Sequence, residues 1–451
     1  MRLSAAPTDM TQGKPLGLLL GFAIPMLIGN LFQQMYNIVD SLVVGNFVGT
    51  QALAAVGISN NPIHVLLAMF IGLGTGATIR ISHHLGAGNP DGVHKAIQTA
   101  NGIILLVALP LTVIGVLAAE PVLRLMSTPA DALADATVYL RVMFIGTLSL
   151  LGYNLNAGIL RGLGDSRSSL LFLIVATIVN IVLDLLFVAV FGWGVLGAAV
   201  ATVIAMTVAW IFSIVFLRRR YPQYAARLWP IVIDKPAFRE MLRLGVPIGL
   251  NDALFSLGHL LLSSLVNTHG SIFAAGYSVG GKVDALTFMP ITSFSAATTT
   301  YVGQNIGAGR IDRVRLGART ALLLTVGWNL ASCAFMLLLG HRLIGLFDSN
   351  PAVIETGYAY ILRLDPFYWI YGIMFILNAV MNGAGEVRMP MIANLVLFWV
   401  IRLPVAYLLS ANLAPANIFF CYPISWVGGL LVTGTYYLTG RWKRRFTPRT
   451  P

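Results

Sequence analysis

Two stretches decide the fold: Arg161-Gly162-Leu163-Gly164-Asp165-Ser166-Arg167 and, 221 residues later, Asn382-Gly383-Ala384-Gly385-Glu386-Val387-Arg388. The same shift relates Leu85-Gly86-Ala87-Gly88 to Ile306-Gly307-Ala308-Gly309. Matches of this kind at one constant spacing indicate an internal repeat. We therefore predict a chain built from two similar halves.

The composition places both halves in a membrane. Apolar residues make up 57% of the 451 residues and charged residues only 10%. Because soluble domains carry about 25% charged residues, this chain cannot cover a water-facing surface. A soluble enzyme, a disordered protein and a secreted disulfide scaffold are thereby excluded. The two cysteines, Cys333 and Cys421, lie in apolar surroundings and are interpreted as small buried hydrophobes.

Apolar runs of about 20 residues mark the membrane helices. We predict an all-α protein with twelve spans, six in each half. The spans fall near 16–45, 52–82, 93–118, 137–162, 168–190, 194–217, 237–268, 273–303, 314–341, 355–383, 390–411 and 415–439.

The basic residues set the orientation. The net charge is +12, and with the N-terminus inside nearly all Lys and Arg fall in the inside segments. The exceptions are Arg124, Arg141, Lys282, Arg342, Arg363 and Arg402. Both termini are therefore expected in the cytoplasm. The Arg218-Arg219-Arg220 run is interpreted as a solvated linker rather than a nucleic-acid site.

An even number of spans per half makes the two repeats run in the same direction. Parallel repeats are one of the two architectures of secondary transporters, with the substrate path between the halves. We predict these parts: an N-terminal six-helix lobe at 1–217, a cytoplasmic linker at 218–236, a C-terminal six-helix lobe at 237–440 and a basic cytoplasmic tail at 441–451.

Motifs for catalysis and for ATP use are absent from the sequence. There is no P-loop, no HExxH and no GxSxG, so we expect neither an enzyme nor a cofactor. Gly72-Leu73-Gly74-Thr75-Gly76 lies inside a predicted span and is interpreted as a close helix contact. The energy for transport is therefore expected from an ion gradient.

Polar residues inside the first-half spans point to the ion site. Tyr36 and Asp40 are four apart on one helix face, and so are Asn180 and Asp184 on another, while Thr202 lies on a third span. Two carboxylates close together in a low dielectric cannot both stay charged without a cation. Either a proton resides on one of them or Na⁺ binds to the oxygens of Asp40, Asn180, Asp184 and Thr202. The alternative is a buried hydrogen-bond cluster that ties the helices together.

The second half does not repeat this cluster. Counting 221 residues forward, Asp40 falls on Leu261 and Asp184 on Val405. The ion chemistry is therefore asymmetric although the scaffold is duplicated.

Other polar, aromatic and thioether residues are candidates for the substrate cavity. These are Asn37, Asn154, Asp252, Met289 and Tyr371. Among the remaining membrane charges, Lys282 and Asp284 are expected to form structural pairs between helices, and Arg402 to neutralise a neighbour or to cap backbone carbonyls.

Taken together, these stretches resemble the MATE family, the multidrug and toxic compound extrusion transporters. The resemblance runs over nearly the whole chain. The segments that carry it are Ala23-Ile24-Pro25, Tyr36-Asn37-Ile38-Val39-Asp40, Arg161-Gly162-Leu163-Gly164-Asp165 and Gln304-Asn305-Ile306-Gly307-Ala308-Gly309.

The resemblance implies two six-helix lobes in a V around a central cavity, and antiport of organic cations or other amphipathic compounds against H⁺ or Na⁺. The first half is similar to the prokaryotic DinF-like branch, whose coupling positions match Asp40, Asn180, Asp184 and Thr202, with Tyr36 and Asn156 nearby. Pro25 matches the place where the first helix bends. Another branch carries acidic residues in the second lobe, and here the matching positions hold Phe255 and Tyr371.

The expected partners are a small amphipathic or cationic substrate and the lipid bilayer, with no nucleic acid, and we expect a monomer. The alternative function is a flippase for a lipid-linked or other amphiphile, as in related folds of the wider superfamily. That function is expected to need a cationic cavity, and the predicted membrane interior holds few cations.

Overall fold

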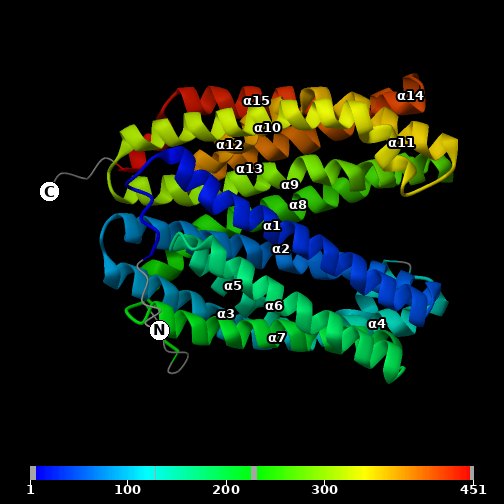
Figure 1. Cartoon of the computed structure of the whole chain (residues 1–451), viewed down its shortest axis with the longest axis horizontal. Helices are drawn as coiled ribbons and strands as arrows, with labels where there is room; N and C mark the ends of the chain where they lie inside the picture. Colours follow the sequence, from blue (N-terminus) through cyan, green and yellow to red (C-terminus); the bar gives the residue numbers. More distant parts are fainter. Residues whose placement is uncertain (1–6, 127, 225–230, 447–451) are drawn as a thin grey trace. The chain divides into compact units, whose positions relative to one another are not determined.

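A computed structural model describes residues 7–126, 128–224 and 231–446, and helices account for most of them (Figure 1). The predicted linker 218–236 and tail 441–451 fall partly outside the described residues. The first half contains α1 (Pro15–Phe47), α2 (Thr50–Gly86), α3 (Pro90–Leu125), α4 (Ala130–Ile145), α5 (Thr147–Gly162), α6 (Ser166–Asp184), the π-helix η1 (Leu185–Val190) and α7 (Gly194–Arg220). The second half contains α8 (Lys235–Asn267), α9 (Ser271–Gly307), α10 (Ile311–Gly345), α11 (Pro351–Leu364), η2 (Asp365–Phe367), α12 (Tyr368–Gly383), α13 (Arg388–Leu395), the π-helix η3 (Val396–Arg402), α14 (Leu403–Asn412), η4 (Pro415–Phe420), α15 (Cys421–Leu438) and η5 (Arg441–Phe446).

The helices account for the twelve predicted spans. Within the described residues, nine helices are long and apolar enough to cross a membrane, and α4 with α5, bent by 55°, makes a tenth. The other two spans are α2 and α9, which occupy the same place in each half. Each packs against three neighbours of its own half: α2 against α3, α4 and α5, and α9 against α10, α11 and α12. A helix surrounded by other helices can carry more polar residues, because fewer of its side chains face lipid.

The backbone confirms the repeat. Gly88 and Gly309, which match at 221 residues, have φ of 63° and 68°. Gly164 and Gly385 have φ of 80° and 79°. A positive φ favours glycine, so each pair fixes the same turn after the second and fourth spans of each half.

The chain forms two compact units whose boundaries lie inside helices. Unit 1 contains Ile24–Gly249, and unit 2 contains Met10–Ala23 and Leu250 onwards. The boundaries in α1 and α8 lie within three residues of Pro25 and Pro247, each inside its helix. Proline removes a helical hydrogen bond, which makes both places suited to a bend. The start of α1, up to Ala23, and the first half of α8, up to Gly249, thus each belong to the unit formed by the other half of the chain.

The first half of α8 is held on unit 1 by glycines. A Cβ at Gly72 would overlap the backbone of Gly245 and Gly249, and one at Gly76 would lie 2.8 Å from the Met241 carbonyl oxygen. The prediction that the glycines of α2 make a close helix contact is therefore confirmed, since small residues four apart let two membrane helices approach.

The segment before α1 is held on unit 2 by polar side chains of α9 and α10. The Met10 backbone N–H donates to Gln304 Oε1 at 2.8 Å, and Asn305 Nδ2 donates to the Met10 carbonyl at 3.1 Å. Arg313 Nη2 donates to the Gly13 carbonyl at 2.9 Å. These donors and acceptors satisfy backbone groups ahead of the helix start, where no helical partner exists.

Candidate functional site

Five of the predicted ion-coupling residues come together in unit 1. α1 supplies Tyr36 and Asp40, α6 supplies Asn180 and Asp184, and α7 supplies Thr202. All five side chains are buried, and those of Asn180 and Asp184 are fully so at 0% exposure. The four-residue spacing in α1 and in α6 places each pair on one helix face, which is why the sequence could bring them together.

Thr202 is the centre of the neutral part of this cluster. The Tyr36 hydroxyl lies 3.2 Å from Thr202 Oγ1, and Asn180 Nδ2 donates to the same oxygen at 3.4 Å. The carboxyl groups of Asp40 and Asp184 lie close enough to interact electrostatically. Three helices thus contribute to one connected polar site.

The site presents acceptor oxygens without donors. Asp40 Oδ1, both carboxyl oxygens of Asp184 and Asn180 Oδ1 are buried and find no hydrogen-bond partner among the described residues. Buried polar atoms without a partner are rare in native proteins, and such an atom calls for an explanation. Protons on the carboxyls, or a hard cation among the oxygens, would supply what is missing.

A π-helical segment follows the site directly. η1 begins at Leu185, the residue after Asp184. Single π-helical turns inside α-helices are rare and are found frequently at functional sites. No sequence pattern predicts this segment, because the run from 185 to 190 is uniformly apolar.

Asn156 does not join the cluster. Its Nδ2 donates to Ser213 Oγ at 2.7 Å. Ser213 lies on α7 about three turns beyond Thr202, so Asn156 sits at a different height along that helix. Its role in ion coupling stays a prediction.

The substrate candidates are scattered. Asn37 is exposed and its Nδ2 donates to Gln34 Oε1 at 3.3 Å, while Asn154 Nδ2 donates to the carbonyl of Leu150 on its own helix at 2.8 Å. In unit 2, Asp252 accepts from Asn251 Nδ2 at 3.3 Å. Met289 is half-buried on α9, and Tyr371 is buried on α12.

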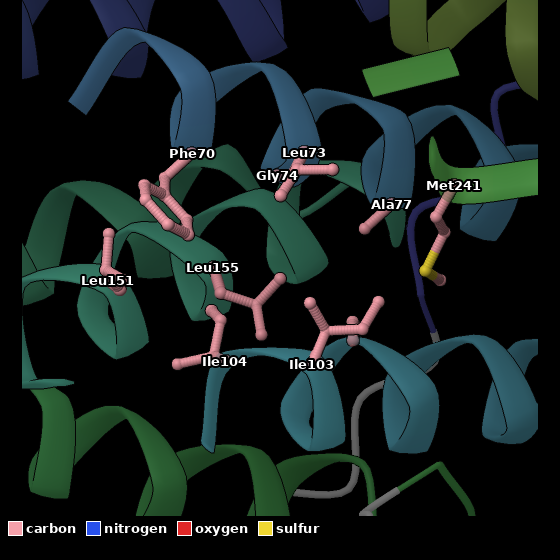
Figure 2. A pocket seen from close by; sticks show the side chains of 10 residues that line it. Phe70, Leu73, Gly74, Ala77, Ile103, Ile104, Leu151, Leu155 and Met241 are labelled. Carbon is pink, nitrogen blue, oxygen red and sulfur yellow. The ribbon is translucent and has the colours of Figure 1, made fainter. Parts of the chain in front are cut away.

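Each unit has a cavity. In unit 1 the cavity is only about 20 Å³ and its lining side chains are apolar, among them Phe70, Leu155 and Met241 (Figure 2). It has room for about one water molecule and has no polar side chain to hold one. In unit 2 a cavity of about 330 Å³ is lined by Tyr371 and by two residues that sequence reasoning had assigned to structural roles, Asp284 and Arg402.

A family model described as MatE matches residues 25–186 and again residues 247–408, so the family unit occurs twice in this chain, once in each half of the internal repeat. The chain belongs to the MATE family. The matched residues cover more than half of the chain, and the recognition made from the sequence motifs is confirmed.

Relatives and solved structures agree with this assignment. The chain is 31% identical over 439 residues to the probable multidrug resistance protein YpnP of Bacillus subtilis, which covers 96% of this chain and 97% of the relative. It is 24% identical to the FAD transporter of Shewanella oneidensis, over 95% of each chain. The structure entitled an outward-facing conformation of a multidrug resistance MATE family transporter superposes with a TM-score of 0.89, at 25% identity and 98% coverage of both chains. This MATE chain is thus a multi-pass membrane protein of a multidrug efflux transporter family with the twelve-helix fold.

Proposed function

We propose that this chain is a secondary antiporter that exports amphipathic or cationic drugs or metabolites in exchange for inward H⁺ or Na⁺. The observation that carries the proposal is the acceptor-only cluster of Asp40, Asn180 and Asp184 in unit 1. An ionisable residue within a membrane span is costly and marks ion pathways in transporters. We propose in addition that the protein is a monomer of the prokaryotic inner membrane with both termini in the cytoplasm, and that it catalyses no reaction.

The cluster would couple ion binding to the position of α1. α1 contributes Tyr36 and Asp40 beyond Pro25, whereas α6 and α7 contribute the remaining oxygens. Without an ion, the two carboxyls repel each other in a low dielectric and favour separation of α1 from α6. With a proton or Na⁺ bound, this repulsion disappears and the closed arrangement is favoured.

The ion can drive export only if its affinity differs between the two arrangements of α1. A ligand shifts an equilibrium between two states by the ratio of its affinities for them. The arrangement of α1 that completes the oxygen set binds the ion more tightly, and the substrate must favour the other arrangement. Exchange of one for the other is then antiport.

Transport by proteoliposomes tests the proposal. A panel of fluorescent organic cations is loaded, and a pH gradient or a Na⁺ gradient is imposed separately. Wild type should show efflux driven by one gradient, and Asp184→Asn should reduce it to the rate of empty liposomes. The matched control is Asp131→Asn, which removes an exposed carboxylate at the start of α4 and should transport normally.

Coupled efflux at the wild-type rate in Asp184→Asn would overturn the ion-site assignment. If neither gradient drives efflux of any compound in the panel, the antiporter proposal is contradicted for that substrate class. A labelled-lipid scrambling assay then measures the flippase alternative.

A further inference from the structure

The cavity in unit 2 has the size and the walls of a small-molecule site. Its volume of about 330 Å³ lies in the range of ligand pockets, which are mostly apolar with a few placed polar groups. Its lining comes from α8, α9, α11, α12, η3 and α15 and is largely aromatic, including Tyr368, Tyr371, Tyr422 and Trp426.

Arg402 is the cationic group of this cavity. Its side chain is fixed by a hydrogen bond from Nε to Ser425 Oγ at 3.0 Å. The guanidinium lies 4.7 Å from the ring centroid of Phe398 and 4.5 Å from that of Tyr422. Arg402 is 1% exposed, and its Nη2 has no hydrogen-bond partner among the described residues. Because arginine stays protonated in proteins, this is a buried charge with an unused donor.

Asp284 is the acidic group of the same cavity. It is 9% exposed, and the Tyr368 hydroxyl donates to its Oδ2 at 2.7 Å. Its Oδ1 has no hydrogen-bond partner within the described part of the chain. Asp284 and Arg402 do not pair with each other, so the cavity holds two separate groups that each lack one partner.

The aromatic side chains between these groups favour a flat ligand. Tyr371 and Trp426 are stacked with ring centroids 5.1 Å apart and planes at 22°. The ring centroid of Tyr368 lies 4.9 Å from that of Trp426, with the two planes tilted at 46°. Aromatic rings prefer offset-stacked or edge-to-face contacts, so a planar ring system would find both kinds of neighbour here.

We propose that this cavity binds a planar aromatic zwitterion, with its carboxylate at Arg402 and its ammonium at Asp284. An anion alone would leave Asp284 Oδ1 unpaired, and a cation alone would leave Arg402 Nη2 unpaired. A molecule with both groups on one ring system satisfies both atoms. That this ligand is also the exported substrate rests on the proposed function, whereas its binding to the cavity does not.

Calorimetry on the purified full-length protein in detergent tests the site without any ion gradient. The probe is 6-(aminomethyl)naphthalene-2-carboxylic acid, and its two single-charge analogues are naphthalene-2-carboxylic acid and 2-(aminomethyl)naphthalene. Wild type should bind the probe at least about tenfold more tightly than either analogue, since a hydrogen bond to a charged group contributes this much.

Two variants assign each end of the probe. Arg402→Met should lower the affinity for the probe and for the acid at least about tenfold but leave the affinity for the amine unchanged. Asp284→Asn, which keeps the shape of the side chain, should lower the affinity for the probe and for the amine but leave the affinity for the acid unchanged. Lys282→Met is the control: it removes a nearby exposed cation outside the cavity lining and should bind as wild type does.

Equal affinity of wild type for the probe and for either analogue would overturn the proposal, as would unchanged probe binding in Asp284→Asn. If Arg402→Met does not fold, Asp284→Asn alone still tests whether the cavity binds the probe through both charged groups. Asp184→Asn keeps both charged groups of this cavity and should keep the preference for the probe over its two analogues, so a failure of ion coupling and a failure of this site give different results.

Discussion

The equivalent spans of the two units carry buried side chains of opposite charge. On the fifth span of its half, unit 1 places Asp184 directly before the π-helix η1, whereas unit 2 places Arg402 at the end of the π-helix η3. The cluster around Asp184 offers acceptor oxygens, while the cavity around Arg402 offers a donor, an acceptor and aromatic walls. The duplicated backbone has been kept, and the buried charges on it have diverged.

This difference separates two tasks that an antiporter must combine. An ion needs a small set of buried oxygens, and in unit 1 the cluster of Asp40, Asn180 and Asp184 supplies them. An organic molecule needs volume and ring faces, and these are found in unit 2. We therefore expect variants in one unit to affect one task and leave the other intact.

The largest effect is expected from the acidic pair. Asp40→Asn, Asp184→Asn and the double variant should each lose gradient-driven efflux to the background rate. Because the two carboxyls hold one ion together, the double variant should be no worse than either single one, as for residues that act as a unit. Initial efflux rates measure this. Losses in the double variant that multiply those of the single variants would show two independent ion sites.

The next effect concerns the contact between α2 and α8. Gly76→Leu would place a side chain against Met241 and Gly245, and overpacking of this kind costs about 1–3 kcal/mol or more. We expect loss of the monodisperse peak in size-exclusion chromatography and a lower Tm. Gly21→Leu in α1 is the control, because no atom lies within 4 Å of a Cβ at Gly21. A folded Gly76→Leu protein with wild-type Tm would contradict the close packing.

A smaller effect is expected where the segment before α1 meets unit 2. Arg313→Gln removes the hydrogen bonds from Nη2 to the carbonyls of Met10 and Gly13. Since these bonds are partly exposed, the free energy of unfolding should fall by about 1 kcal/mol. Arg315→Gln, an exposed arginine on the same helix, should leave the Tm unchanged. If both variants have the same Tm, the segment contributes nothing to stability.

The smallest effect is expected at the end of α7, outside the membrane. The Tyr221 hydroxyl donates to Asp165 Oδ2 at 2.7 Å, and burial, followed by the charge of Asp165, raises the pKa of Tyr221 from 10.0 to about 12. A raised folded-state pKa gives stability that is complete below pH 10 and is lost as pH rises towards 12.

Tyr221→Phe should therefore lower the free energy of unfolding by only about 0.5 kcal/mol at neutral pH, because the Ser168 hydroxyl still donates to Asp165 Oδ2. The Tm difference from wild type should shrink between pH 10 and 12. Tyr224→Phe is a control at a neighbouring tyrosine. A Tm difference that stays constant up to pH 12 would contradict the role assigned to this hydrogen bond.

Much of the fold could be predicted from the sequence, because each apolar run specifies one helix and the glycine stretches specify the repeat. The ion cluster could be predicted because Tyr36 with Asp40, and Asn180 with Asp184, each share a helix face. The apolar runs did not indicate where the two compact units meet inside α1 and α8, although Pro25 and Pro247 lie within three residues of those boundaries. Lobes were predicted from continuity of the chain, which says nothing about which unit a helix end contacts.

The cavity in unit 2 could not be predicted from spacing. Its lining comes from six elements spread between α8 and α15, and no sequence period connects them. Arg402 was expected to neutralise a neighbour or to cap carbonyls, whereas its hydrogen bond goes to the Ser425 hydroxyl and its faces meet Phe398 and Tyr422. Asn156 could not be placed from the sequence either. Helical spacing shows on which face of its helix a residue lies, but not which residues of a neighbouring helix lie at the same level.

Equilibrium binding to three purified proteins tests the division of tasks most directly: wild type, Asp184→Asn and Arg402→Met. Ion binding is measured as ²²Na⁺ uptake and as proton release on raising the pH, and ligand binding with the naphthalene zwitterion. We expect Asp184→Asn to lose the ion signal but to bind the zwitterion, and Arg402→Met to do the reverse. Loss of both signals in one variant, or an intact ion signal in Asp184→Asn, would contradict it.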